Sequence, residues 1–239
     1  MKPVAIIKTG ETLPDIAAAR GDFENWISEG LGADISVNTI EVFKGETLPN
    51  PATLSGIVIT GSPAMVTDRE DWSERTADWL HEVASAKIPT LGICYGHQLI
   101  AHAFGGEVGS NPNGREIGTA DIQLESSAAQ DPLFASIDAP LAMQTSHLES
   151  VLALPPAAKL LATTSLDPHH AFSLDDFMWG IQFHPEFDKD IVQRYIRLRQ
   201  PAIESEGLDA DAIFDAAQES SHSDTLWSSF MQIIQARNA

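Results

Sequence analysis

The feature that most constrains the fold is the stretch of residues 88–106, which reads IPTLGICYGHQLIAHAFGG. A short apolar run ends at Ile93, a turn follows at Cys94, and a helical pattern then continues until Gly105 and Gly106. Glycines on both sides of the turn allow a sharp bend, because they lack a Cβ atom. The stretch therefore predicts a buried strand, a tight turn and a helix. The helix N-terminus beneath Cys94 offers free N–H groups and partial positive charge, which favour a thiolate and an oxyanion.

The first half of the chain repeats the order of strand and helix. Besides the 88–106 stretch, strands are expected at residues 3–8, 35–43 and 56–60, and helices at 15–30 and 70–86. This pattern predicts an α/β fold: a doubly wound, mostly parallel sheet with helices on both faces. Ligands bind beyond the carboxyl ends of the strands in such sheets, so the turns at Gly61 and Cys94 are expected to be neighbours.

The second half of the chain has a different pattern, with many short strands and few helices between them. Short strands separated by Pro and Gly are expected at residues 107–110, 117–124, 140–144, 148–153, 159–164, 170–174 and 177–183. They predict antiparallel additions at one edge of the sheet, with the last strand returning to the crevice. Helices are expected at 188–204, with a break at Pro201, and at 208–220 and 222–237. We expect one domain at 1–200 and a helical C-terminal appendix at 201–239 that packs on it, with a homodimer contact as the alternative.

Composition excludes several classes of function. The chain has 239 residues, 43% of them hydrophobic, and no apolar run near the roughly 20 residues of a membrane span. The N-terminal apolar run is too short for a signal peptide, so a cytoplasmic location is expected. The net charge of −20, from 14 Lys and Arg against 34 Asp and Glu, disfavours nucleic acid and anionic membranes as partners. A single cysteine forms no internal disulfide, and by itself it is more often a small buried hydrophobe.

A nucleophilic cysteine needs a base within hydrogen-bond reach and a group that orients the base. The histidines at 97 and 102 lie on the helix after Cys94, so we favour a base from another strand. In the segment 177–187, FMWGIQFHPEF, His184 stands at the end of a strand that Pro185 terminates, and Glu186 can stay on the same side. This spacing suggests a Cys94–His184–Glu186 triad. A structural strand-end histidine is the alternative on spacing alone.

The turn Gly61-Ser62-Pro63 supplies a second part of the expected site. Backbone N–H groups at such a turn can form an anion-binding nest. Together with the N–H of Tyr95, they would form an oxyanion hole. An ordinary turn between a strand and a loop is the alternative.

These pieces together resemble the class I, triad-type glutamine amidotransferases. Residues 92–98 (GICYGHQ) resemble the nucleophile turn, residues 180–186 (GIQFHPE) the His-x-Glu segment, and residues 59–63 (ITGSP) the oxyanion strand of that family. The resemblance extends over about residues 3–190. It implies a flavodoxin-like fold and a cysteine hydrolase: Cys94 attacks the side-chain amide of glutamine, ammonia leaves, and water hydrolyses a γ-glutamyl thioester on Cys94.

The resemblance also implies substrate contacts. Gln98 matches the glutamine that contacts the substrate, and Ser146 and His147 match a segment whose backbone holds the amino-acid end of glutamine. Residues 114–118 (GREIG) resemble a loop of the GMP-synthetase-like branch, with a solvated turn as the alternative. No cofactor and no metal are expected, because the adjacent His169 and His170 would face opposite ways in a strand.

The acceptor of the ammonia stays open. The sequence contains no synthetase domain and no ATP-binding P-loop after the triad segment, so a separate synthetase or acceptor protein is a possible partner. A free-standing γ-glutamyl peptide hydrolase is the first alternative. A non-catalytic regulatory protein that keeps the fold is the second, although a binding role does not need an intact triad.

Overall fold

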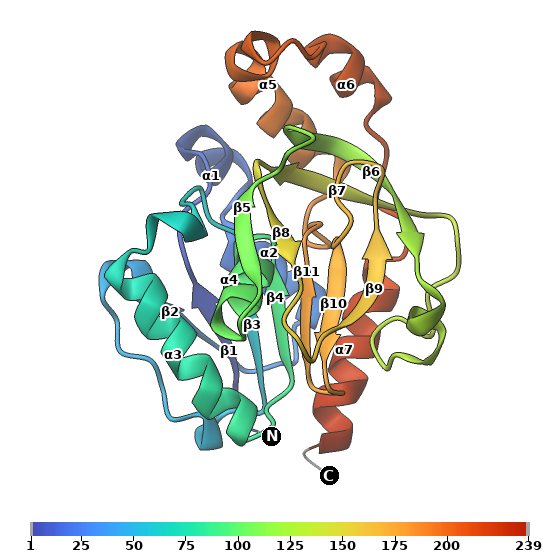
Figure 1. The fold of residues 1–239 in the computed structure, drawn as a ribbon. Helices are drawn as coiled ribbons and strands as arrows, with labels where there is room; N and C mark the ends of the chain where they lie inside the picture. The colour runs from blue at the N-terminus through green and yellow to red at the C-terminus, as the bar shows by residue number, and fades with distance from the viewer. Residues whose placement is uncertain (1, 238–239) are drawn as a thin grey trace.

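The computed structural model describes residues 2–237. Residue 1 of the expected domain 1–200 and residues 238–239 of the expected appendix 201–239 lie outside the described residues. The first half contains β1 (Val4–Lys8), α1 (Pro14–Arg20), α2 (Phe23–Leu31), β2 (Val37–Glu41), β3 (Gly56–Ile59), α3 (Asp71–Ser85), β4 (Thr90–Ile93) and α4 (Tyr95–Ala103). The alternation of strand and helix expected from the sequence is therefore present (Figure 1).

The second half contributes most of the remaining strands and the last helices. In chain order they are β5 (Glu107–Ser110), β6 (Glu116–Leu124), β7 (Leu141–His147), β8 (Glu149–Ala153), β9 (Lys159–Thr163), β10 (Ala171–Leu174), β11 (Met178–Ile181), α5 (Lys189–Ser205), α6 (Ala210–Ala216) and α7 (Ser223–Arg237). Short single-turn 3₁₀ helices occupy the connections at Val42–Lys44, Pro51–Thr53, Val66–Asp68 and Ser126–Gln130.

The main sheet has the strand order β2-β1-β3-β4-β11-β10-β9-β6-β7 in the described part of the chain. The strands from β2 to β11 in this order run parallel to their neighbours, and β10, β9, β6 and β7 are joined by antiparallel pairing. β5 and β8 form a separate antiparallel pair. The predicted α/β fold is confirmed, including the antiparallel edge and the return of the last strand, β11, beside β4.

Each face of the sheet buries its own layer of helices. Successive side chains of a strand point to opposite faces, and in β1 Val4 and Ile6 join one buried cluster while Ala5 and Ile7 join the other. The first cluster includes side chains of α1, α2 and α7, and the second includes side chains of α3 and α4. In α7 the side chains of Leu226, Trp227, Phe230 and Ile234 are buried in the first cluster.

Three details differ from the sequence-based expectation. The helix expected over 15–30 is interrupted, because Gly21 adopts φ +81° and Asp22 starts α2 with a capping box to Asn25. Pro201 does not break α5, which continues to Ser205 and buries Ile203 against Val192 and Ile196. The helix expected over 208–220 is shorter, since α6 ends at Ala216.

The helices α5 and α6 lie above the carboxyl ends of the parallel strands (Figure 1). There α5 packs against α1, β6 and β7. This arrangement places α5 over the edge of the sheet where a parallel α/β fold binds its ligands.

Candidate active site

Cys94 occupies a strained turn between β4 and α4. It is one of the few non-glycine residues with positive φ, at 51° with ψ −99°, and it forms the N-cap of α4. A non-glycine residue in such a conformation costs about 1–3 kcal/mol and persists only where surrounding packing enforces it. Its backbone N–H donates to the Ile181 carbonyl at 2.8 Å, which ties the turn to β11. The turn is therefore anchored to the strand that leads to His184.

Two glycines permit this turn because the backbones approach closely. A Cβ atom on Gly92 would lie 2.4 Å from the Gly96 carbonyl oxygen, and one on Gly96 would lie 2.6 Å from the Ile59 carbonyl oxygen. No side chain fits at either position, so the first turn of α4 packs directly on β3 and β4.

His184 follows β11 and pairs with Glu186. Its Nδ1 lies 2.7 Å from Glu186 Oε1, and the side chains are 3% and 0% exposed, so the pair is shielded from water. This contact leaves Nε2 as the ring nitrogen available to Cys94. Burial opposes a charged ring, but the charges of Glu186 and Cys94 outweigh it and raise the pKa of His184 to about 10. A proton on this ring is therefore held strongly beside the sulfur.

Phe187 fixes the plane of the His184 ring, the candidate catalytic imidazole. The rings of His184 and Phe187 are stacked, with centroids 4.0 Å apart and an interplanar angle of 12°. Phe187 in turn stacks on Tyr195 of α5 at 5.2 Å and on Phe23 of α2 at 6.2 Å. The sequence-based reading did not single out Phe187, although it directly follows the His-Pro-Glu segment.

Gly61 directly follows Thr60 at the end of β3 and lies against both His184 and Cys94. A Cβ atom on Gly61 would lie 3.0 Å from His184 Cε1 and 3.7 Å from Cys94 Cβ. Among the described residues, neither the Gly61 nor the Tyr95 backbone N–H has a hydrogen-bond acceptor. Both N–H groups are therefore available to an oxyanion formed beside Cys94.

Gln98, Ser146 and His147 are all brought to this region, with different roles for their side chains. Ser146 lines the space next to Cys94. The Gln98 side-chain amide donates to the Glu149 carbonyl at 2.8 Å and to Gln182 Oε1 at 2.9 Å. The ring nitrogens of His147 lie 3.0 Å from the Glu149 carbonyl oxygen and 2.9 Å from Glu116 Oε2. β7 reaches the site because the His184 N–H donates to the Gln144 carbonyl at 2.8 Å.

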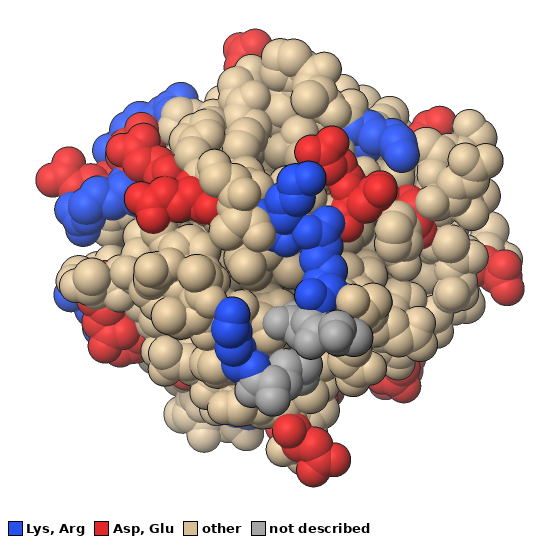
Figure 2. All heavy atoms as spheres, turned by 90° about the horizontal axis from the view of Figure 1, so that it is seen from below, with Lys and Arg blue, Asp and Glu red and all other residues tan. Residues whose placement is uncertain are grey.

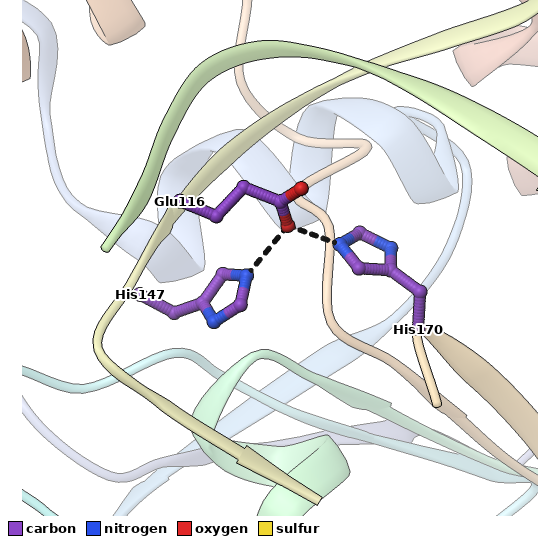
Figure 3. A group of neighbouring side chains, drawn as sticks. All are labelled: Glu116, His147 and His170. Atoms are coloured by element: carbon purple, nitrogen blue, oxygen red, sulfur yellow. Dashed lines mark hydrogen bonds and ion pairs between the residues drawn. The ribbon is translucent and has the colours of Figure 1, made fainter. Parts of the chain in front are cut away.

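Figure 3 shows a cluster of three side chains: Glu116 at the start of β6, His147 at the end of β7 and His170 directly before β10. Nε2 of His147 and Nε2 of His170 each lie 2.9 Å from Glu116 Oε2 (Figure 3), and Thr164 donates to the other carboxylate oxygen. Among the described residues this is the one group whose ligand atoms lie close enough, within 4.8 Å, to hold a metal ion. His169 faces away, toward the Val151 carbonyl, as its adjacency to His170 predicts. Adjacency alone could not show that His170 meets Glu116.

The other histidines near Cys94 are poorly placed as bases. His97 is fully buried, its ring packs on Phe172 with centroids 5.0 Å apart, and burial lowers its pKa to about 3. His102 lies near the surface beside Glu74. The preference for a base from another strand is consistent with this arrangement.

Two arginines near Cys94 were not assigned from the sequence. Arg115 lies in the segment 114–118 and makes a bidentate ion pair with Glu206 of α5, with both N–O distances 2.8 Å. Arg199 comes from α5 and lines the space beside Cys94. A helix pattern reveals that Tyr195 and Arg199 share a face at spacing i, i+4, but not that this face covers the site.

The negative charge is distributed. On the face in Figure 2, acidic and basic side chains are interspersed, near the middle of the face as well as at its rim. Within residues 2–237, no helix is long and apolar enough to cross a membrane.

Comparison with known proteins agrees with the geometry. The family model described as glutamine amidotransferase class-I matches residues 24–196. The chain therefore belongs to the class I glutamine amidotransferase family.

Relatives named for different activities are similar to this chain at comparable levels of identity. The chain is 36% identical over 134 residues to a GMP synthase (glutamine-hydrolysing) of Clostridium perfringens, a match covering 56% of this chain and 25% of that protein. It is 33% identical over 140 residues to gamma-glutamyl peptidase 3 of Arabidopsis thaliana, covering 57% of this chain and 56% of that protein. Each match thus spans little more than half of the relative, or less.

Solved structures confirm the fold over nearly the whole chain. A glutamine amidotransferase of Thermotoga maritima superposes with a TM-score of 0.72 at 20% identity, covering 99% of this chain and 98% of the other. A glutamine amidotransferase of Methylobacillus flagellatus gives a TM-score of 0.71 at 22% identity, covering 98% and 93%.

Proposed function

We propose that this protein is a cysteine hydrolase that cleaves the γ-amide bond of glutamine or of a γ-glutamyl compound. The observation that carries the proposal is the convergence of Cys94, the His184–Glu186 pair and the Gly61 turn at one end of the sheet. Residues 1–200 would form the catalytic domain and 201–239 its helical appendix.

In the proposed reaction, His184 already carries the proton of the Cys94 thiol, and the sulfur of Cys94 attacks the γ-carbonyl carbon. The Gly61 and Tyr95 N–H groups stabilise the oxyanion. His184 returns the proton to the leaving nitrogen, the C–N bond breaks, and a γ-glutamyl thioester remains. Water, deprotonated by His184, then releases glutamate and restores the thiol. Glu186 holds the ring throughout, and no step requires a metal or cofactor.

Two substrate classes fit this chemistry. Release of ammonia from glutamine would suit a protein that supplies a separate synthetase or acceptor protein. Cleavage of a γ-glutamyl peptide needs no partner. The similarity to a GMP synthase supports the first, and the similarity to a γ-glutamyl peptidase supports the second. A free thiol at Cys94 fits a reducing compartment such as the cytoplasm.

The test is to compare hydrolysis of glutamine and of γ-glutamyl dipeptides by the purified protein and by Cys94→Ala. We expect turnover of at least one of these substrates, complete loss in Cys94→Ala, and a γ-glutamyl adduct on Cys94 by mass spectrometry. Turnover that persists without the thiol would refute the mechanism. Absence of any turnover, with labelling of Cys94 also absent, would favour the non-catalytic alternative.

A further inference from the structure

Two pockets meet at Cys94 and share Ser146 and Arg199 on their walls. The first, here named the Gln98 pocket, is also lined by Gln98 and by His147. The second, the His184 pocket, is lined by His184 and not by Gln98. A substrate whose scissile carbonyl lies at the sulfur can therefore extend into both pockets, one on each side of the bond that breaks.

The chemistry assigns a side of the substrate to each pocket. The leaving nitrogen must lie within reach of the group that protonates it, and His184 is that group in the proposed reaction. The leaving amine is therefore expected in the His184 pocket. The γ-glutamyl part, recognised through the Gln98–Ser146 region, then occupies the Gln98 pocket.

The walls of the His184 pocket carry more apolar groups than the release of ammonia requires. They include the apolar and aromatic side chains of Leu13, Phe23, Phe187 and Tyr195. Such a lining suits an organic leaving group with an apolar part, since binding pockets gain most of their affinity from apolar contact and direction from a few polar groups.

Among the charged groups on the wall of this pocket, Arg199 has no ion-pair or hydrogen-bond partner within residues 2–237. No ion pair or hydrogen bond of the described residues involves its guanidinium, and its Nε is buried without an acceptor. Its carbon Cζ lies 5.7 Å from the centre of the Tyr195 ring on its own helix. Burial lowers the pKa of Arg199 from its usual value, and the nearby Arg115 adds to this effect. A partly buried guanidinium stays charged and is stabilised by a carboxylate that pairs with it.

The other charged groups around these pockets are already paired. Arg115 is bound bidentately to Glu206. Glu11, on the wall of the His184 pocket, is ion-paired with Lys44 at 2.7 Å. Arg199 is thus the cation that an incoming anion can bind without displacing a partner within the described residues.

We propose that Arg199 binds a carboxylate carried by the leaving amine, which makes γ-glutamyl amino acids with an apolar side chain the preferred substrates. This inference rests on the proposed function and narrows its substrate class. In the reaction, Sγ forms a bond to the γ-carbonyl carbon, the C–N bond breaks, and the amino acid leaves with the proton from His184. Water then converts the thioester to glutamate.

The experiment compares kcat/KM for γ-glutamyl-leucine, for the same dipeptide with its C-terminal carboxylate converted to a carboxamide, and for glutamine. The variants are Arg199→Met and Arg199→Lys. Arg194→Met is the matched control, because Arg194 lies on the same helix but pairs with Asp190 at the surface. Thermal unfolding of each variant checks that it is folded.

We expect the wild-type protein to prefer the dipeptide acid over its carboxamide by about 30-fold or more, the usual effect of one charge-assisted pair in a shielded site. Arg199→Met should remove this preference, Arg199→Lys should restore part of it, and Arg194→Met should retain it in full. Equal wild-type turnover of acid and carboxamide, or an equal loss on all three substrates in Arg199→Met, would overturn the inference while the proposed function stands.

A separate result would identify failure of the proposed function. If the wild-type protein turns over none of the three compounds, calorimetry with Cys94→Ala decides the question of binding. Tighter binding of the dipeptide acid than of its carboxamide, lost when Arg199→Met is added, would support the carboxylate site. Equal binding of the acid and the carboxamide would refute it.

Discussion

Replacing Gly61 with alanine is expected to impair catalysis without unfolding the protein. The backbone at Gly61 is not in the left-handed region, so alanine can adopt it. The new Cβ would lie 3.0 Å from His184 Cε1, about 0.5 Å closer than carbon atoms ordinarily approach. The ring cannot readily move away, because Phe187 is stacked on it at 4.0 Å. Contact with Cys94 or Glu186 must therefore change.

The expected magnitude follows from this displacement. A misplacement of 1 Å costs on the order of 10²-fold in rate, so a shift of about half that, with a methyl group beside the oxyanion position, should lower kcat/KM by roughly 10- to 100-fold. Alanine reduces the entropy of the unfolded chain by about 0.4–1 kcal/mol, which offsets part of the steric strain. We therefore expect the free energy of unfolding to change by less than about 2 kcal/mol.

Gly109→Ala is the matched control for this prediction. Gly109 also has a backbone conformation open to alanine, and its Cβ would meet Leu152 Cδ1 at 2.8 Å. Leu152 is 38% exposed and can turn away. The assays are steady-state hydrolysis and denaturant unfolding. Activity within twofold of wild type in Gly61→Ala, or an equal loss in Gly109→Ala, would refute the inference that Gly61 lies against the proposed catalytic pair, Cys94 and His184.

Four further outcomes are expected. His184→Ala should remove activity nearly as completely as Cys94→Ala, whereas Glu186→Gln should cost less, as measured by kcat; an equal loss would contradict a purely orienting role for Glu186. Burial opposes the charged form of His184, but the charges of Glu186 and Cys94 raise its pKa to about 10. The value of kcat/KM should therefore fall as the pH rises through about 10. Glu186→Gln should move this fall in kcat/KM to lower pH. Burial opposes ionisation of Glu116, but its two imidazole partners hold its pKa below the usual value of 4.5. Glu116→Gln should therefore lower the free energy of unfolding by about 3 kcal/mol at pH 7, and the difference from wild type should shrink as the pH falls below 4.5, in urea titrations. Prolonged treatment with EDTA should leave turnover unchanged, and a loss restored by a divalent metal would assign that metal a role at the Glu116 cluster.

Several properties could be predicted from short segments. The alternation of apolar strands and amphipathic helices defined the α/β class, because the periods of strand and helix are local properties of the chain. The glycines around Cys94 indicated a sharp turn. In the structure, Gly92 and Gly96 are the positions at which neighbouring backbones approach closely in this turn. The two-residue spacing of His184 and Glu186 suggested their contact, and the resemblance of residues 180–186 to the His-x-Glu segment of the family favoured it over a structural histidine.

Other features depend on long-range packing. The break at Gly21 was not predicted, because the apolar spacing of residues 15–30 continues across it; the capping box of Asp22 and Asn25 became clear only in the structure. His170 meets Glu116 and His147 only because separate strands converge there. No local pattern places Arg199 beside Cys94, since that depends on how α5 crosses β6 and β7.

The sequence by itself determined the tight turn at Cys94, because a strand, its flanking glycines and a helix are governed by local backbone sterics. It also pointed to the His184–Glu186 pair, whose members are two positions apart. The tertiary structure decided which residues surround the Cys94 sulfur. That choice depends on side-chain packing between elements about a hundred residues apart, and it places the unpaired charge of Arg199 beside the sulfur.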